Sequence, residues 1–121
     1  MKSAVNWFEI PVVDLDRATK FYEGVLKAGF RRENFFGTEM AVFKTEEPGV
    51  GGALIRQEKM HPQEDGTLVY LNLNGQLDAA IGRVQGAGGA VLLPKTSIGD
   101  AGDIAIIRDS EGNRVGLHSE K

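Results

Sequence analysis

Residues 12–29 read VVDLDRATKFYEGVLKAG, and this stretch decides the fold because the chain repeats it. Asp14 stands where a helix N-cap belongs, and Gly29 where a terminating C′ glycine belongs. Residues 75–89, GQLDAAIGRVQGAGG, follow the same pattern and are expected to end their helix at Gly88 or Gly89. The apolar residues at helical spacing are Leu15, Ala18, Phe21, Tyr22, Val25 and Leu26 in the first copy, and Leu77, Ala80, Ile81 and Val84 in the second. The repeat predicts two equivalent amphipathic helices.

The similarity continues downstream of both helices. Residues 39–44, EMAVFK, match residues 103–108, DIAIIR, and each run leads through a turn into a further short strand. The strands expected in the first half are 5–10, 31–36, 39–44 and 52–55, and those in the second half are 68–73, 91–93, 103–108 and 115–118. Each half therefore has the order strand, helix, three strands, which predicts an α+β fold built from two βαβββ modules.

Turn residues divide the chain in the same way. Residues 109–113, DSEGN, predict a hairpin loop, and residues 47–49, EPG, are its counterpart in the first half. The polar segment 59–66, KMHPQEDG, is interpreted as a linker between module one, residues 1–58, and module two, residues 67–121. Neither module is large enough to bury its sheet alone, so the modules are expected to pack on each other or on a second chain, within a single domain of residues 1–121.

Composition limits the possible partners. The 121 residues include no cysteine, which removes disulfides, thiolate nucleophiles and cysteine metal sites. The formal net charge of −3 argues against a nucleic-acid or anionic-membrane partner, because both require a basic face. Apolar runs such as residues 104–107 are too short to span a bilayer, so a cytoplasmic protein is expected.

Three stretches together carry a family resemblance. They are FEIPVVDLDRATKFYEGVLKAGF at residues 8–30, GGALI at 51–55 and GDIAIIRDSEGNRVGL at 102–117. In this order they resemble the vicinal oxygen chelate superfamily, which contains glyoxalase I, bleomycin-resistance proteins and extradiol dioxygenases. The resemblance implies paired βαβββ modules whose sheets form an incomplete barrel around a cleft, and it implies a homodimer. One fold hosts many chemistries, so the resemblance does not fix a reaction.

The resemblance also implies where a metal would be bound in metal-dependent members. The four ligand positions fall on Trp7, Ala53, Leu68 (or Val69 with a one-residue slip) and Gly116. None of these side chains can bind a divalent ion, which needs several nitrogen or oxygen donors. We therefore predict no metal site at these positions and no cofactor.

Strand alternation indicates which residues share the predicted cleft face. If Trp7 points into the cleft, so do Glu9 and Pro11. The corresponding residues of the second module are Leu68, Tyr70 and Asn72 on its first strand, and Arg114, Gly116 and His118 on its last.

Two of these residues are candidates for proton transfer. Glu9 lies in an apolar strand, where burial of an unpaired carboxylate would raise its pKa, so it is the best candidate for a general base. The structural alternative is a carboxylate paired with an Arg or Lys at a sheet edge. His118 is a candidate acid–base partner, and its alternative is a solvated residue near the chain end.

Four other residues are candidates for ligand binding. Trp7 would supply a stacking wall for a planar ligand, or would simply fill the core. Gly116 would leave room beside it. Tyr70 and Asn72 would orient a ligand by hydrogen bonds, or would bond to each other or to nearby backbone. The arginines Arg56, Arg108 and Arg114 are able to hold a carboxylate or phosphate, although charged residues at strand ends are commonly just solvated.

Three functions follow from these candidates. The first is metal-independent proton-transfer chemistry of lyase or isomerase type on a small molecule, with Glu9 and His118 as the acting groups. The second is binding or sequestration of a drug-like molecule without chemistry. The third is a metal-dependent glyoxalase-like lyase with a relocated site that uses Glu9 and His118, and the empty ligand positions disfavour it.

Overall fold

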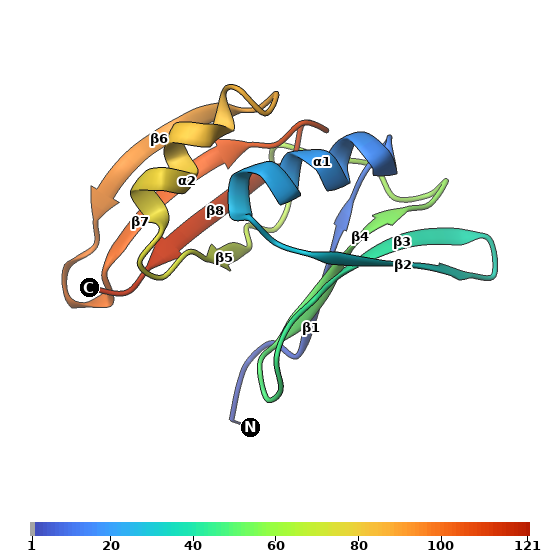
Figure 1. Ribbon diagram of the computed structural model, residues 1–121, viewed down its shortest axis with the longest axis horizontal. Coiled ribbons are helices and arrows are strands. Elements are labelled where there is room, and N and C mark those ends of the chain that lie inside the picture. Colours follow the sequence, from blue (N-terminus) through green and yellow to red (C-terminus); the bar gives the residue numbers. More distant parts are fainter. Residues whose placement is uncertain (1) are drawn as a thin grey trace.

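The computed structural model describes residues 2–121 and shows two βαβββ modules in one chain (Figure 1). Module one contains β1 (Trp7–Pro11), α1 (Leu15–Leu26), β2 (Phe30–Phe35), β3 (Thr38–Phe43) and β4 (Gly51–Arg56). Module two contains β5 (Tyr70–Asn72), α2 (Leu77–Val84), β6 (Ala90–Ser97), the short 3-10 helix η1 (Gly99–Ala101), β7 (Asp103–Arg108) and β8 (Arg114–Ser119). The predicted α+β fold is confirmed.

Each module forms a separate four-stranded sheet with the same topology. The strand orders are β1-β4-β3-β2 and β5-β8-β7-β6. In each sheet the first and last strands of the module pair in parallel, and the other neighbours pair antiparallel. Within this chain the two sheets are not closed into a barrel. The two sheets diverge from a junction beneath the helices, and the C-terminus lies at the far end of the second sheet (Figure 1).

Helix α1 begins as the sequence predicts and ends differently. The Asp14 carboxylate accepts a hydrogen bond from the Arg17 amide at 3.0 Å. The predicted C′ role of Gly29 is wrong, because Lys27 takes the left-handed conformation (φ 56°) and its amide bonds to the Glu23 carbonyl at 3.0 Å. Lys27 is exposed, and a residue with a Cβ adopts this conformation at a local cost of about 1–2 kcal/mol. The Gly29 carbonyl instead accepts a hydrogen bond from the Lys44 amide at 3.0 Å.

Module two departs from the predicted boundaries at three places. Helix α2 ends at Val84, and Gly88 then takes a positive φ of 102° in the turn that follows. The Gly89 amide bonds to the Val84 carbonyl at 3.0 Å, so the glycine pair closes the helix end as a turn. β5 is shorter than predicted and β6 longer. β6 includes Pro94, which is tolerated because β6 is an edge strand with register shifts.

Both helices lie on the same side of the molecule and share one hydrophobic core. α1 and α2 pack against each other, and the buried side chains beneath them come from both modules. Ile10 and Leu54 of the first sheet and Leu71 and Leu117 of the second belong to this single cluster. Because side chains alternate along a strand, the neighbours of these residues lie on the opposite, helix-free faces of the sheets.

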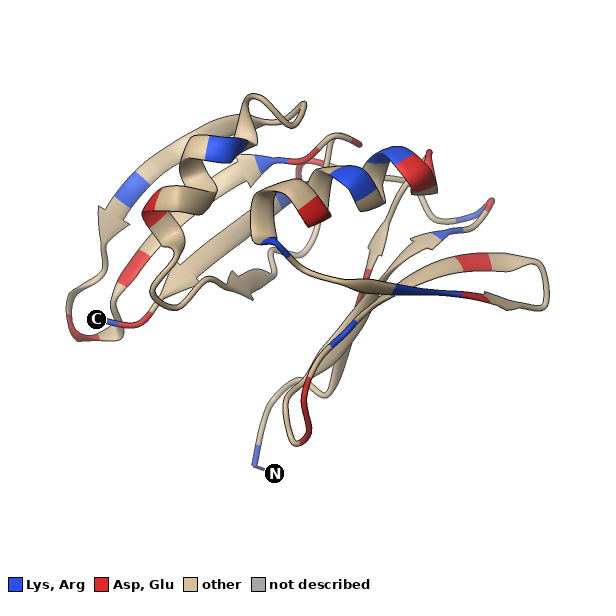
Figure 2. Ribbon diagram, viewed as in Figure 1, with Lys and Arg blue, Asp and Glu red and all other residues tan. Residues whose placement is uncertain are grey.

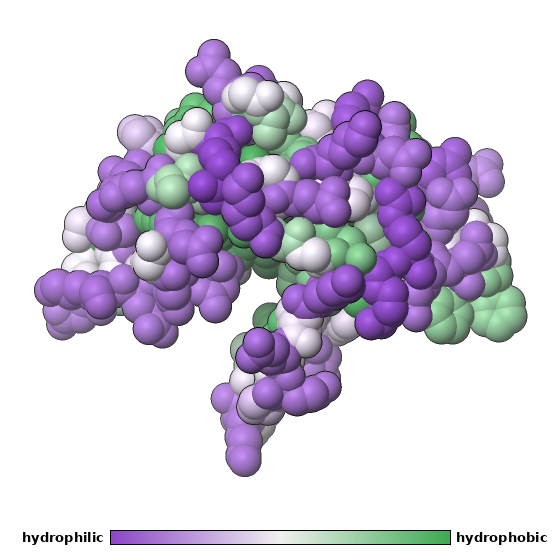
Figure 3. Space-filling view, viewed as in Figure 1, coloured by the Kyte–Doolittle hydropathy of each residue, from purple (hydrophilic) through white to green (hydrophobic). Residues whose placement is uncertain are grey.

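The surface has mixed charge and an indentation between the two sheets. Acidic and basic residues alternate along α1 and over the β2–β3 hairpin (Figure 2). The surface is hollowed where the two sheets diverge, and hydrophobic side chains lie at the tip of the β2–β3 hairpin, where Phe35 and Phe36 are exposed (Figure 3). Among the described residues, no helix is long and apolar enough to cross a bilayer.

Candidate functional site

Trp7 and Glu9 lie together on the helix-free face of the first sheet. Their neighbour Ile10 is buried in the core, which places both side chains on the opposite face. Trp7 is 44% exposed, and its Nε1 donates a hydrogen bond to Glu9 Oε2 at 3.3 Å. The Glu9 carboxylate is itself exposed, so the sequence-based expectation of a buried carboxylate does not hold for this chain. Within residues 2–121 no cation forms an ion pair with it.

Tyr70, Gly116, Asn72 and His118 lie together on the second sheet. Tyr70 is the register partner of Gly116, and Asn72 is the partner of His118. A Cβ at Gly116 would collide with the Tyr70 ring, so this glycine allows the ring to lie close over the β8 backbone. Tyr70 remains 45% exposed. The glycine therefore holds an aromatic surface in place at the helix-free face.

His118 is half-buried and bonded to the η1 turn. Its Nε2 lies 2.6 Å from the Ala101 carbonyl oxygen, which can only accept, so this nitrogen carries the proton in that contact. Nδ1, the other ring nitrogen, makes no hydrogen bond within residues 2–121. Asn72 uses its Oδ1 to accept from the Asn74 amide at 3.0 Å.

The single chain brings the predicted site residues together as two groups and does not join them. Trp7 and Glu9 belong to the first sheet, and the other four residues belong to the second. No hydrogen bond among residues 2–121 connects the two groups. Glu9 and His118 are therefore not assembled as an acid–base pair within one chain.

The chelating positions implied by the family resemblance contain no ligand set. Trp7 carries an N–H donor, Ala53 and Leu68 are aliphatic, and Gly116 has no side chain. Ala53 is also fully buried. Across residues 2–121, no group of three or more His, Cys, Asp or Glu is placed to hold a metal ion. The residues at these four positions do not fit a divalent metal.

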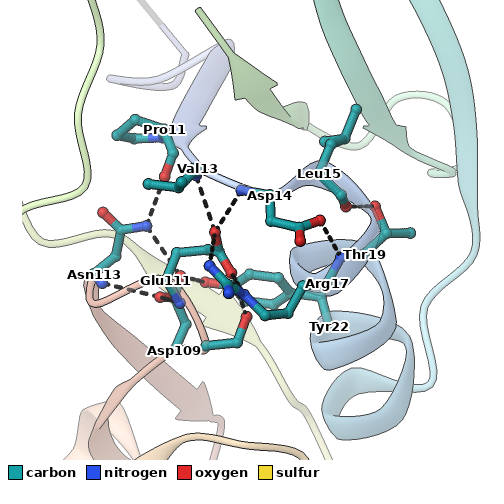
Figure 4. Close-up of polar contacts among 11 residues, drawn as sticks. Pro11, Val13, Asp14, Leu15, Arg17, Thr19, Tyr22, Asp109, Glu111 and Asn113 are labelled. Atoms are coloured by element: carbon teal, nitrogen blue, oxygen red, sulfur yellow. Dashed lines mark hydrogen bonds and ion pairs between the residues drawn. The ribbon is translucent and has the colours of Figure 1, made fainter.

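The β7–β8 turn joins the two modules (Figure 4). The sequence predicted a hairpin loop here but did not indicate that the loop would contact module one. The Glu111 side chain is fully buried and accepts from the Val13 and Asp14 amides at 2.9 and 2.8 Å. It also pairs with the Arg17 guanidinium at 2.6 and 3.0 Å. Glu111 of module two therefore caps the N-terminus of α1 in module one.

Asp109 and Asn113 complete this junction. Asp109 Oδ2 accepts a 2.5 Å hydrogen bond from the buried Tyr22 hydroxyl, and its Oδ1 accepts from the Asn113 amide at 2.9 Å. The Asn113 amide side chain donates to the Pro11 carbonyl at 2.7 Å. These contacts fix the end of β1 against the start of β8. The Asp at 109 and the Asn at 113 in a hairpin loop were the available sequence signal, since such residues commonly bond to backbone.

The junction shifts the pKa values of three groups. Burial alone would raise the pKa of Glu111, but hydrogen bonds from Arg17, Asp14 and Val13 outweigh it and hold this pKa below its ordinary value. The hydrogen bond and charge of Glu111 raise the pKa of Arg17. Burial raises the pKa of Tyr22 well above 10, and the nearby Asp109 carboxylate adds to the effect.

A pocket of about 390 Å³ lies at this junction, between β1, the 61–69 segment and the start of β8. Its lining includes Glu9 and Arg114 as well as apolar side chains. A larger open hollow of about 760 Å³ lies beside the β2–β3 hairpin and contains none of the six predicted site residues. Of the six predicted site residues, Glu9 alone lines the junction pocket.

Comparisons with known proteins agree with this architecture. The family model of the Glyoxalase/Bleomycin resistance protein/Dioxygenase superfamily matches residues 4–117. Similar solved structures include a glyoxylase/bleomycin resistance protein/dioxygenase domain from Frankia sp. EAN1pec, with TM-score 0.77, 19% identity and coverage of 100% of this chain and 94% of that chain. A glyoxalase/bleomycin resistance protein from Albidiferax ferrireducens T118 has TM-score 0.72, 17% identity and coverage of 98% and 100%.

A third similar structure is the genomically encoded fosfomycin resistance protein FosX from Listeria monocytogenes, with TM-score 0.70, 15% identity and coverage of 100% and 94%. No curated protein sequence matches the chain. At these identities the structural likeness establishes the fold and leaves the ligand and reaction to be argued from the residues.

Proposed function

Because the chain belongs to the Glyoxalase/Bleomycin resistance protein/Dioxygenase superfamily, we propose that it binds a small organic molecule against the helix-free faces of its sheets, without a metal at the chelating positions. The observation that carries this proposal is the exposed Trp7 ring, held by its hydrogen bond to Glu9 on the helix-free face. A flat apolar surface beside an exposed carboxylate suits a planar ligand with a polar edge.

Tyr70 supports the same function from the second sheet. Its half-exposed ring lies over Gly116 and offers a second aromatic surface, and the paired Asn72 and His118 offer polar groups next to it. A ligand held between two aromatic walls would gain both burial and stacking, and pairs of this kind contribute about 0.5–1.5 kcal/mol beyond area burial.

We propose that a second copy of the chain completes this site. On the helix-free faces of the single chain, Trp7 and Tyr70 are both exposed, although Ala53 on the first sheet is buried. In a homodimer the first sheet of one copy would face the second sheet of its partner, which would close a cleft between them. This arrangement would also remove exposed aromatic surface from water.

Proton-transfer chemistry is a second candidate, favoured by the exposed position of Glu9. The carboxylate is exposed and has no cationic partner among the described residues, so it is free to take a proton from a bound substrate. His118, on the facing sheet of the other copy, would take up a proton from solvent at Nδ1 and deliver it to the substrate. This candidate requires the dimer, because one chain does not bring the two residues together.

We expect a planar aromatic ligand found by a thermal-shift screen to stabilise the protein and to quench the fluorescence of Trp7, the sole tryptophan. At a hundredfold excess over its dissociation constant, the ligand should add about 2.7 kcal/mol to the free energy of unfolding. Trp7→Leu should weaken binding about tenfold, measured by calorimetry, because the stacking surface is lost. Phe36→Leu, at the exposed hairpin tip, is the matched control and should leave binding unchanged. Ligands that stabilise the protein without affecting Trp7 would contradict the proposal.

Incubation with the ligand distinguishes the two candidate functions. Mass spectrometry that detects no conversion supports simple binding. If a product forms, Glu9→Gln should lower turnover about a hundredfold while binding persists, because general-base catalysis contributes about 10²–10⁴-fold. Stoichiometric Ni, Zn, Mn or Fe in protein purified without chelator would contradict metal-free binding.

A further inference from the structure

Arg114 occupies an unusual position at the junction pocket. Its Nε atom is buried and has no hydrogen-bond partner among residues 2–121. No carboxylate within that range forms an ion pair with it either. A buried guanidinium donor without a partner is costly, since each unsatisfied polar group loses its interaction with water. Because Nε itself is sealed from solvent, an acceptor from a ligand would pair with the terminal nitrogens of this guanidinium, which lines the pocket.

The neighbouring arginine shows how the same charge is satisfied elsewhere. Arg108 is the register partner of Arg114 across β7 and β8, so both side chains project from the same face of the sheet. Arg108 Nη1 pairs with Glu64 Oε1 at 3.1 Å. Arg114 has no such carboxylate within the described part of the chain, and it lines the junction pocket.

The rest of the pocket limits the ligand in size and charge. Phe8, Ile10, Val69 and Val115 provide apolar walls around a volume of about 390 Å³, which is within the range of small-molecule sites. Glu9 lines the same pocket and would repel a dianion more than a monoanion. A carboxylate carries one negative charge and matches the planar guanidinium fork with two parallel hydrogen bonds.

We propose that the junction pocket binds the carboxylate group of a small organic acid through Arg114, with the apolar body of the acid against the β1 and β8 walls. The proposal rests on the small-molecule function proposed above and names its ligand class. The Asn113 contacts to Pro11 and to the Gln63 amide hold the pocket walls in place, so the site is formed before the ligand enters.

Benzoate and its neutral isostere benzamide are the probes that test this inference. We expect the wild-type protein to bind benzoate at least about tenfold more tightly than benzamide, measured by calorimetry. In two-dimensional NMR, benzoate should shift the amide signals of residues 61–69 and 113–115. Arg114→Gln should abolish the preference for benzoate. Arg114→Lys keeps the positive charge but loses the two parallel hydrogen bonds of the guanidinium, so it should leave about a threefold preference.

Two further variants separate a local effect from a general charge effect. Arg31→Gln removes one positive charge from β2, far along the other sheet, and should leave the preference for benzoate unchanged. Glu9→Gln removes the negative charge from the pocket and should tighten benzoate binding about twofold to threefold. A purely structural role of Arg114 would not produce this increase.

The results also separate this inference from the proposed function. The carboxylate site would be overturned if the wild-type protein bound the two probes equally. It would also be overturned if Arg114→Gln and Arg31→Gln lost the preference for benzoate equally, or if the NMR shifts were confined to other segments. Quenching of Trp7 by a neutral planar ligand would still support the proposed function in that case. Arg114-dependent benzoate binding, with no compound in the screen affecting Trp7, would support the pocket and contradict the wider proposal.

Discussion

Replacing Glu111 with alanine is expected to lower the free energy of unfolding by about 3 kcal/mol, one of the largest single-residue effects in this protein. The buried side chain accepts hydrogen bonds from two backbone amides, two guanidinium nitrogens and the Ser110 hydroxyl. Glu111→Ala leaves the Val13 and Asp14 amides at the start of α1 without an acceptor. It also removes the ion pair between the β7–β8 turn and Arg17 of module one. Urea unfolding followed by circular dichroism measures the loss.

Two variants provide controls for Glu111→Ala. Glu111→Gln keeps an oxygen acceptor for the amides and loses the charge, so we expect about half the effect. Asp100→Asn removes the same unit of charge from a fully exposed side chain and should change stability by less than about 0.5 kcal/mol. A Glu111→Ala protein as stable as the Asp100→Asn protein would show that the junction contributes little.

The same contacts predict the dependence of stability on pH. The pKa of Glu111 is lower in the folded chain than its ordinary value of 4.5, so its contribution is present above that value and is lost as the pH falls through the folded pKa. The difference between wild type and Glu111→Ala should therefore shrink in acid. Tyr22 has the opposite sign: its raised pKa means that stability falls as the pH rises above 10. Tyr22→Phe should flatten that alkaline decline in unfolding measurements from about pH 9 to about pH 11.

Gly102→Ala is the second change with a large expected effect, also about 3 kcal/mol or more. Gly102 has φ 109° and ψ −140°, a region that residues with a Cβ adopt at a cost of about 1–3 kcal/mol. An added Cβ would also collide with the Ser119 carbonyl oxygen, a backbone atom that cannot rotate away. The strand pairing of β7 with β8 must shift to make room. Thermal unfolding should show a loss of roughly 10 °C.

Gly99→Ala is the matched control in the same turn. Gly99 also has a positive φ, 79°, but no atom beyond its chain neighbours lies within 4 Å of the position that a Cβ would take. This variant should cost about 1–2 kcal/mol from conformation alone. Because Gly102 follows Ala101, Gly102→Ala should also displace the Ala101 carbonyl and change the NMR signals of the His118 ring, which Gly99→Ala should leave in place. Equal losses in both variants would contradict the role assigned to the collision.

The sequence predicted the fold well because periodicity and repetition are local signals. The apolar stripes of α1 and α2 and the matched runs at 39–44 and 103–108 were sufficient to order the elements. Boundaries were less accurate where tertiary contacts decide them. Lys27 ends α1 in place of Gly29 because an exposed residue can adopt the left-handed conformation when the Glu23 carbonyl is available to its amide.

The site was predicted less completely because it depends on distances between segments. Alternation placed Trp7, Glu9, Tyr70 and His118 on helix-free faces, yet it contains no information on the angle between the two sheets. That angle keeps Glu9 and His118 apart in one chain. The partners of Glu111 could not be predicted either, since Val13 and Arg17 lie more than ninety residues away in sequence.

The capping of α1 by Glu111 makes the two halves unequal despite their shared sequence pattern. α1 receives Asp14 from its own half and Glu111 from the other, whereas α2 begins at Gln76 with no side-chain cap among the described residues. The N-terminus of α1 in the first half consequently depends on the β7–β8 turn of the second half. A tandem protein made from two first halves would lack Glu111, and with it the acceptor that the Val13 and Asp14 amides use in this chain.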